Sequence, residues 1–302
     1  MSFSVAHFSD LHLGPLPQGS ALHDFRPKRL LGALSWHFRR KKLHDPNVAD
    51  ALRVDILNSK PDHIAFTGDG VNIASPKEFP LLLKWMEHLG PADFVSYIPG
   101  NHDTYVKAAY EKSLGLIEPY MRGDMRPNST GELPFPYVRL RRNVALIGLN
   151  SAIPRGFHSA EGRLGQAQRD ALRQRLVELK GKGFYRLVMI HHPPATGIAT
   201  KLRSLIDAPE LMAVLAEAGA ELVIHGHNHR REMNWLETGT SRIPLIGVPS
   251  ASMASPHHPA EWNLYSITRN GGRWQTQVSM RGWQGTTKGF QTVGTFMLDE
   301  VA

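Results

Sequence analysis

Short apolar runs of strand length recur along the chain, and several of them end directly in a group of polar residues. The runs that end in this way cover residues 3–8, 63–67, 94–98, 186–190 and 221–224. Nearly continuous apolar runs of this length are typical of strands buried on both faces of a sheet. Because α/β proteins usually assemble ligand sites at the ends of such strands, the pattern predicts a site built from these polar groups.

Helical periodicity lies between the apolar runs, and the last third of the chain changes character. Apolar residues recur at helical spacing over 48–57, 78–89, 166–180 and 208–218. Later residues predict strands over 232–236, 243–248, 263–269 and 273–280, so that the sheet ends near residue 280. No repeat or linker marks a boundary. We therefore expect one α/β domain over 1–302, with two packed mixed β-sheets flanked by helices and a mainly β part from about 231.

The composition narrows the chemistry. Hydrophobic residues make up 41% and charged residues 21% of the 302 residues, as in globular chains. The sequence contains no apolar run long enough to span a membrane and no recognisable signal peptide at its start, so we expect a cytoplasmic location. Cysteine is absent, which excludes disulfides, thiolate nucleophiles and cysteine-bound zinc. A metal would have to be held by His, Asp, Glu, Asn, backbone or water.

The polar groups after the apolar runs contain residue types that bind metal ions. They are Asp10 and His12, Asp69, Asn101 with His102 and Asp103, His191, and His227 with His229. Taken singly each group is a weak signal, because a Gly-Asp pair is usually a turn and a lone histidine is usually structural. Their conjunction at successive predicted strand ends supplies nitrogen and oxygen ligands in the number that two metal ions need.

In residue sequence and in order along the chain, these groups resemble the motifs of the calcineurin-like metallophosphoesterases. They are most similar to the bacterial branch of cyclic-nucleotide phosphodiesterases and glycerophosphodiesterases. The matching stretches are Phe-Ser-Asp-Leu-His-Leu, Pro-Gly-Asn-His-Asp, His-His-Pro-Pro and Gly-His-Asn-His. The resemblance implies a metallophosphoesterase-like sandwich with two divalent or transition metal ions, Mn, Fe or Zn. It assigns Asp10, His12, Asp69 and His229 to one ion, and Asp69, Asn101, His191 and His227 to the other. Gly70 departs from the family, which usually has an aliphatic residue there, and predicts looser local packing.

The resemblance also implies a reaction. A hydroxide bridging the two ions would attack the phosphorus of a small anionic substrate, with phosphodiesters favoured. His102 is not a ligand in the family and is predicted to act as general acid toward the leaving oxygen. Asp103 either orients His102 or caps a helix beginning near Thr104. The alternatives are a hydrolase of lipid-linked phosphate or pyrophosphate, or of nucleic acid, and less plausibly a scaffold, since every expected ligand is present.

A basic segment, residues 24–45, follows the first motif and contributes to a net charge of +8. Its cations are Arg26, Lys28, Arg29, Arg39, Arg40, Lys41 and Lys42, with leucines at near-helical spacing between them. One interpretation is an amphipathic element over 26–42 that binds acidic lipid and makes the protein peripheral to a membrane. The other is a solvated helix that packs its leucines on the domain. In both cases the cations can attract an anionic substrate.

Overall fold

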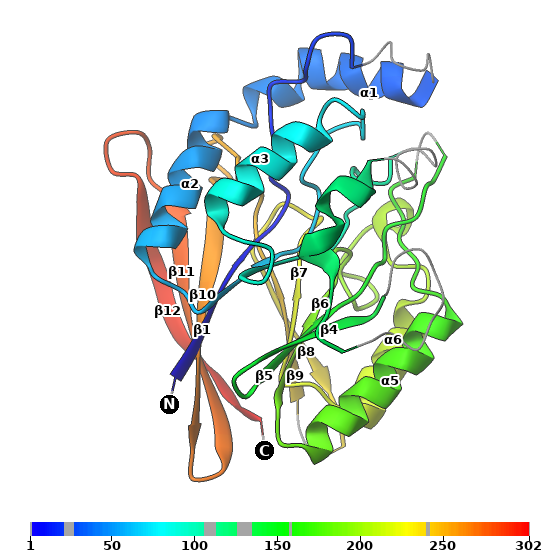
Figure 1. Cartoon of the computed structure of the whole chain (residues 1–302), viewed down its shortest axis with the longest axis vertical. Helices are drawn as coiled ribbons and strands as arrows, with labels where there is room; N and C mark the ends of the chain where they lie inside the picture. Colours follow the sequence, from blue (N-terminus) through cyan, green and yellow to red (C-terminus); the bar gives the residue numbers. More distant parts are fainter. Residues whose placement is uncertain are drawn as a thin grey trace.

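Two mixed β-sheets form the centre of the protein. The computed structural model describes residues 2–20, 27–105, 113–125, 135–156, 159–239 and 242–301 (Figure 1). The first sheet has the order β12-β11-β10-β1-β2-β3 and the second β4-β5-β6-β7-β9-β8. The strands of the first sheet are β1 (Ser2–Phe8), β2 (His63–Phe66), β3 (Val95–Tyr97), β10 (Glu261–Asn270), β11 (Arg273–Trp283) and β12 (Phe290–Val301). Those of the second are β4 (Tyr137–Arg141), β5 (Val144–Gly148), β6 (Tyr185–Met189), β7 (Leu222–His225), β8 (Glu232–Glu237) and β9 (Arg242–Gly247). The predicted α/β architecture with two mixed sheets is confirmed.

Strand direction brings the predicted site residues to one edge of each sheet. In the first sheet β1, β2 and β3 are mutually parallel, whereas β10 is antiparallel to β1. In the second sheet β5, β6, β7 and β9 are parallel neighbours. A parallel bridge between Ser9 and Ser250 joins the end of β1 to the segment after β9. The carboxyl ends of the two sets of parallel strands therefore meet, as the polar strand ends predicted.

Both faces of the central strands are buried. In β5, Val144 and Leu146 belong to the core between the sheets, while Ala145 and Ile147 pack with helices α5 and α6. The same alternation in β6 places Leu187 in the core between the sheets and Val188 in the core beneath the helices. This double burial explains the nearly continuous apolar runs in the sequence, since neither face of the strand meets water.

Helices cover the outer faces of the two sheets. Figure 1 shows α2 and α3 over the first sheet and α5 and α6 over the second. Asp45 caps α2, because its carboxylate accepts the Asn47 N–H at 2.8 Å and Pro46 occupies the first turn. None of the helices in the described ranges is long and apolar enough to cross a membrane. The helices are α1 (Pro27–Phe38), α2 (Pro46–Asn58), α3 (Phe79–Leu89), α5 (Gln166–Gly181) and α6 (Ala208–Ala218), with short 3₁₀ helices at Arg40–Lys42, Leu114–Met121 and Lys201–Arg203.

Two details of the sequence analysis are wrong. The sheet does not end near residue 280, because β11 runs to Trp283 and β12 adds a further edge strand. The leucines of the basic segment do not all pack on the domain either, because Leu31 and Leu34 are exposed. Helix α1 instead buries Arg29, Gly32 and Trp36. Asp24 and Arg26 of that segment lie outside the described residues.

Candidate metal centre

The sequence-predicted ligands converge on one buried cluster from loops that follow five parallel strands. Asp10 follows β1, Asp69 follows β2 and Asn101 follows β3. His191 follows β6 and His227 follows β7, so the second sheet supplies the opposite side. All of these side chains except Asn101 are almost completely buried. Buried carboxylates and imidazoles in such number need compensating partners, which makes the cluster the leading candidate for a functional site.

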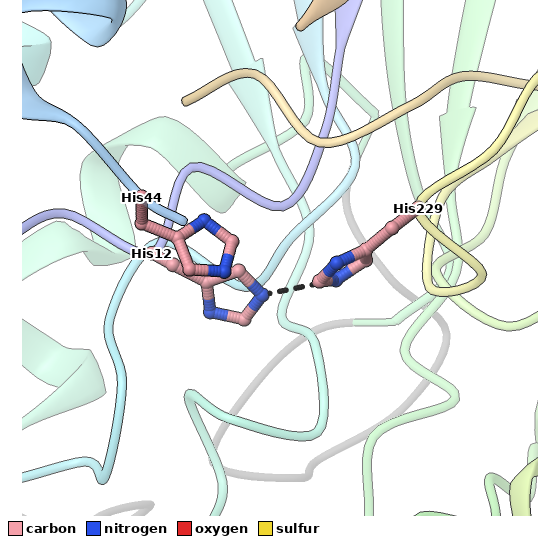
Figure 2. A group of neighbouring side chains, drawn as sticks. All are labelled: His12, His44 and His229. Carbon is pink, nitrogen blue, oxygen red and sulfur yellow. Dashed lines mark hydrogen bonds between the residues drawn. The ribbon is translucent and has the colours of Figure 1, made fainter. Parts of the chain in front are cut away.

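One half of the cluster contains Asp10, His12 and His229. The Nε2 atom of His229 lies 3.1 Å from Asp10 Oδ1 and 3.1 Å from the Nε2 atom of His12. Figure 2 shows the His12 and His229 rings facing each other across this gap. Asp69 Oδ2 lies 3.8 Å from His12 Nε2 and so borders the same space.

The other half contains Asn101, His191 and His227. The amide oxygen of Asn101 lies 2.8 Å from His227 Nδ1 and 3.1 Å from His191 Nε2. The same His191 nitrogen lies 3.5 Å from Asp69 Oδ2. One oxygen of Asp69 therefore lies between the two halves, within 3.8 Å of a histidine in each.

The donor atoms fit metal ions. His12 Nδ1 faces the Val71 carbonyl at 3.3 Å and His191 Nδ1 faces the Thr67 carbonyl at 2.7 Å. A carbonyl accepts the Nδ1 proton, which directs the Nε2 lone pair of each ring into the cluster. Asp10 Oδ1 is buried and faces the His229 Nε2 atom at 3.1 Å. Ligands bound to one ion at about 2.0–2.2 Å lie roughly 3 Å from one another, which is the spacing found here.

The electrostatics of the cluster favour the ionised form of both carboxylates. Burial alone would raise the pKa of Asp10, but His229 and His191 outweigh it and hold that pKa below its usual value. Asp69 shows the same balance, with burial opposed by His191 and His102 and the pKa well below normal. Burial works against charge on His191, yet the Asp69 and Asp10 carboxylates raise its pKa to about 9. A proton on His191 thus offsets the buried carboxylates of the metal-free chain, and bound cations would serve the same need.

His102 lies at the edge of this cluster and is fixed through its backbone. Its N–H donates to Asp69 Oδ1 at 2.7 Å, while its Nδ1 lies 2.5 Å from the Asn72 carbonyl and 3.3 Å from an Arg40 guanidinium nitrogen. The carbonyl contact assigns the proton to Nδ1 and leaves Nε2 as acceptor in the neutral ring. Burial lowers the pKa of His102 to about 4, with Asp69 opposing this shift and Arg40 adding to it.

Asp103 contacts the backbone rather than the His102 ring. Its carboxylate accepts hydrogen bonds from the Asp69, Gly70, Val71 and Gly100 amides at 2.7–3.2 Å and from the Tyr97 hydroxyl at 2.6 Å. Burial and the nearby Asp69 carboxylate raise the pKa of Asp103 to about 7, and the hydrogen-bond donors oppose this rise. The following residues to Tyr105 form turns and residues 106–112 lie outside the described ranges, so the helix expected near Thr104 is not among the described helices.

The ligand loops contain unusual backbone conformations. Five cluster residues have positive φ angles between 43° and 72°, a region that residues other than glycine rarely adopt; they are Asp10, His12, Asp69, His227 and His229. A Cβ atom at Gly100 would overlap the Asp69 carboxylate, and one at Gly226 would overlap Ser9 and Asp10. The two motif glycines thus permit the close approach of these loops.

Gly70 has a different consequence from the one predicted. A Cβ atom on Gly70 would lie 2.5 Å from Leu82 Cδ2 and 3.1 Å from the Tyr97 hydroxyl. Since α3 packs directly on the loop after Asp69, a larger residue would not fit without a shift. The departure from the family pattern therefore accompanies tight packing, and the expectation of looser packing is wrong.

Sequence reasoning missed His44 of the basic segment, and it did not foresee that Arg40 contacts His102. The buried His44 ring lies 4.6 Å from the His12 ring and 5.8 Å from the His229 ring between centroids (Figure 2). Its Nδ1 contacts Ser252 Oγ at 2.9 Å, and one of its nitrogens lies within 4.8 Å of ligand atoms of His12 and His229. Arg40 lies against His102. Neither residue has a motif around it, and only tertiary structure brings the segment to the cluster.

His192 is the other conspicuous histidine of the motifs. Its Nδ1 lies 2.8 Å from Ser151 Oγ and its Nε2 lies 3.0 Å from the Ala160 carbonyl, so both ring nitrogens are occupied away from the ligands. Its ring packs 4.5 Å from that of His227. His192 therefore supports a ligand ring and belongs outside the ligand set.

Comparisons with known proteins identify the family of the chain. Residues 3–231 match the calcineurin-like phosphoesterase family. A probable cyclic nucleotide phosphodiesterase of Synechococcus is 28% identical over 284 residues, covering 92% of each chain. Among solved structures, a dimetal phosphatase from Danio rerio is 14% identical with a TM-score of 0.64, covering 98% of each chain. A purple acid phosphatase from yellow lupin is 12% identical with a TM-score of 0.59, covering 98% of this chain and 53% of that one. The two structures show likeness of fold alone.

Proposed function

Because the chain belongs to the calcineurin-like phosphoesterase family, we propose that it is a two-metal hydrolase of small anionic phosphodiesters. The observation that carries this proposal is the position of Asp69 Oδ2, within 3.8 Å of His12 Nε2 and 3.5 Å of His191 Nε2. A carboxylate between two sets of ligands is suited to bridge a pair of cations. The similarity to a probable cyclic nucleotide phosphodiesterase supports diesters over other phosphate esters.

The proposed ligands divide between two ions that share Asp69. Asp10, His12, Asp69 and His229 would hold one ion, and Asp69, Asn101, His191 and His227 the other. Their mixed nitrogen and oxygen donors suit Mn, Fe or Zn. When bound, such ions lower the pKa of a water nucleophile and stabilise negative charge on the phosphoryl oxygens. The chain itself supplies the rest: it orients the ligands, excludes water and provides a proton donor.

His102 is the proposed donor to the leaving oxygen. Its backbone is fixed by Asp69, and its Nδ1 proton is committed to the Asn72 carbonyl. The ring must therefore gain a second proton, at Nε2, before it can donate one. An anionic substrate beside the ring would favour that protonated form, against the burial that lowers its pKa. In this proposal Asp103 is a positioning residue, because its contacts are with the backbone on either side of the ligands.

A hydrolysis panel tests the proposal. The purified chain, reconstituted with Mn²⁺, is assayed on bis(p-nitrophenyl) phosphate, p-nitrophenyl phosphate, cyclic nucleotides, glycerophosphodiesters, lipid phosphates and single-stranded DNA. We expect metal-dependent turnover of at least one small diester, faster than of the monoester, and none by Asp69→Ala. Turnover confined to the monoester would contradict the proposed diester preference. Activity that survives Asp69→Ala would contradict the shared ligand.

Lipid-linked phosphates are the alternative substrate class, and the surface of α1 favours them. Leu31, Leu34 and Phe38 are 56%, 52% and 72% exposed, and Arg39 and the exposed lysines 41 and 42 follow them. Exposed apolar and basic side chains on one helical element are typical of helices that lie in an anionic membrane surface. Sedimentation with vesicles of zwitterionic or anionic lipid tests this alternative. Binding to anionic vesicles that Phe38→Ser weakens, without loss of bis(p-nitrophenyl) phosphate turnover, would favour it.

A further inference from the structure

Two cavities border Tyr105 next to the proposed metal-ligand cluster. The first, of about 300 Å³, begins at Asn101 and His102 and extends to Leu202 and Arg203. The second, of about 440 Å³, extends from His102 along α1. Lys28, His102 and Tyr105 border both cavities. The space continuous with the cluster is therefore larger than a single phosphoryl group needs, and the rest of the substrate must account for it.

The charged residues that border these cavities are all cations. Lys28 and Arg40 come from the basic segment, and Arg203 and Arg155 come from loops of the second sheet. No aspartate or glutamate borders either cavity within the described part of the chain. Arg155 is paired with Glu161. The remaining three cations form no ion pair among the described residues, whereas arginines such as Arg186, Arg231 and Arg281 each pair with a carboxylate.

These three cations are held in place by neutral groups. Lys28 donates to the Arg155 carbonyl at 2.9 Å, and Arg203 donates to the His227 carbonyl at 2.7 Å. Arg40 contacts His102 and the Asn72 carbonyl, and its Nε atom is buried without a partner. Burial lowers the pKa of Lys28 to about 8. Burial lowers the pKa of Arg40, and the nearby Asp69 and Glu78 carboxylates oppose that shift without forming an ion pair. Partly buried cations without an ion-pair partner are costly, and a bound anion would offset that cost.

Helix α1 is fixed in the position that directs Lys28 over the cavities. Arg29 donates to the Ile73 and Ala74 carbonyls, which anchors the helix to the loop after Asp69. At Gly32 a Cβ atom would lie 2.9 Å from the Tyr105 hydroxyl, so glycine allows the helix to pack against that ring. The Lys28 ammonium lies 4.2 Å from the Tyr105 ring centroid, and the Tyr105 ring stacks on His102 at 5.5 Å. Lys28 is thus separated from the reacting region by one aromatic ring.

We propose that these two cavities bind a second anionic group of the substrate, a phosphate or a carboxylate, separate from the phosphoryl group that is cleaved. Lys28 lies over the Tyr105 ring, and Arg203 borders the same cavity as Lys28 and Asn101, so a second anion in this cavity would lie within reach of both cations. The substrate class is then a phosphodiester with an additional charged group on one arm. This inference rests on the proposed diesterase function.

Matched substrates test the inference. A series of p-nitrophenyl phosphodiesters shares the leaving group, while the other arm ends in a hydroxyl, a carboxylate or a phosphate. We expect kcat/KM of the wild-type protein to be about tenfold or more higher for a charged arm, as one well-placed charge pair provides. Lys28→Met and Arg203→Met should each lower the charged-to-hydroxyl ratio severalfold, mainly through KM. Carboxylate and phosphate arms then distinguish the two kinds of anion.

Lys42→Met is the matched control, because Lys42 is an exposed cation of the same segment and borders neither cavity. It should leave the ratio unchanged. Equal rates for charged and hydroxyl arms, or an equal effect of Lys42→Met, would overturn the inference. If the wild-type protein hydrolyses no diester, the proposed function fails separately. Calorimetry that compares the binding of an alkyl bisphosphate with that of the alkyl monophosphate then tests the inference by itself. Tighter binding of the bisphosphate that Lys28→Met abolishes would support the inference, and equal binding of the two compounds would refute it.

Discussion

The carboxylate of Asp103 offers a sharp test of how the ligand loops are held. It accepts four backbone amides and one hydroxyl, divided between its two oxygens. Oδ2 serves Asp69, Gly100 and the Tyr97 hydroxyl, and Oδ1 serves Gly70 and Val71. Asparagine has nearly the same shape but presents a donor in place of one oxygen. In either orientation at least two backbone N–H groups of the loops would face an NH₂ group.

The magnitude follows from those lost acceptors. The better orientation keeps the amide oxygen toward Asp69 and Gly100 and leaves the Gly70 and Val71 amides unpaired. Gly70 retains a weak second acceptor, the Tyr97 hydroxyl at 3.4 Å. A buried N–H without a partner costs about 1–3 kcal/mol, so Asp103→Asn should lower the free energy of unfolding by about 2–4 kcal/mol. Asp103→Asn should also weaken metal binding, because the proposed ligand Asp69 lies in the same loop as the Gly70 and Val71 amides.

Urea unfolding of the metal-free chain in chelator measures the first effect, and metal content after dialysis measures the second. Asp124→Asn is the control: Asp124 also accepts a backbone amide, from Leu140 at 2.7 Å, but its side chain is 44% exposed. It should change the free energy of unfolding by no more than about 1 kcal/mol. If Asp103 acts only by orienting His102, Asp103→Asn will match the wild-type chain in stability and metal content and lose activity alone. That result would refute the positioning role.

Three further outcomes are expected. Reconstituted protein should approach two transition metals per chain by elemental analysis, and Asp69→Ala should lose both; retention of two tightly held ions would contradict the bridge. His102→Ala should keep its metals and lower kcat by about 10²–10⁴-fold on poor leaving groups but much less on nitrophenol esters, whereas equal losses would exclude a general acid. Burial holds the pKa of His63 well below normal. Its stabilising contribution is therefore full above about pH 6.5 and is lost as the pH falls. His63→Gln should reduce the acid-side slope of the free energy of unfolding by up to about 1.4 kcal/mol per pH unit, and an unchanged slope would contradict a role for the buried neutral ring.

The sequence predicts those elements of the fold whose burial produces a regular pattern of apolar residues along the chain. Central strands such as β6 have both faces buried, and their nearly continuous apolar runs indicate this burial. The edge strand β12 escapes notice because its residues from Gln291 to Met297 are mostly exposed and carry little apolar periodicity. The side of helix α1 that is buried could not be predicted for another reason. Arg29 is buried because two backbone carbonyls of a loop distant in the sequence accept its N–H groups, and the local sequence pattern does not include that loop.

The same distinction applies to the candidate site. Ligand-type residues of the motifs follow predicted strands, so their convergence follows from strand direction. His44 and Arg40 reach the cluster only through the packing of the basic segment, which no spacing encodes. The different contacts of His102 and Asp103 likewise could not be predicted from their being neighbours in the sequence. Successive backbone turns send one side chain to the Asn72 carbonyl and the other into a ring of amides.

The strain of the ligand loops and the network around Asp103 are two parts of one arrangement. Positive φ angles at residues such as Asp10 and Asp69 cost on the order of 1–3 kcal/mol each and persist only where the surroundings fix the backbone. Around Asp69 the fixing groups are the amides bound by Asp103, and around His227 they include the Asp10 carboxylate, which accepts the His227 N–H at 2.8 Å. Two of the three strained loops are thus held by an acidic side chain from another loop, whereas Asp10 and His12 donate their N–H groups to the Gly68 and Asp69 carbonyls. If these residues bind metal as proposed, we expect their positions to be set before any ion binds, so that metal binding need not bear the cost of ordering them.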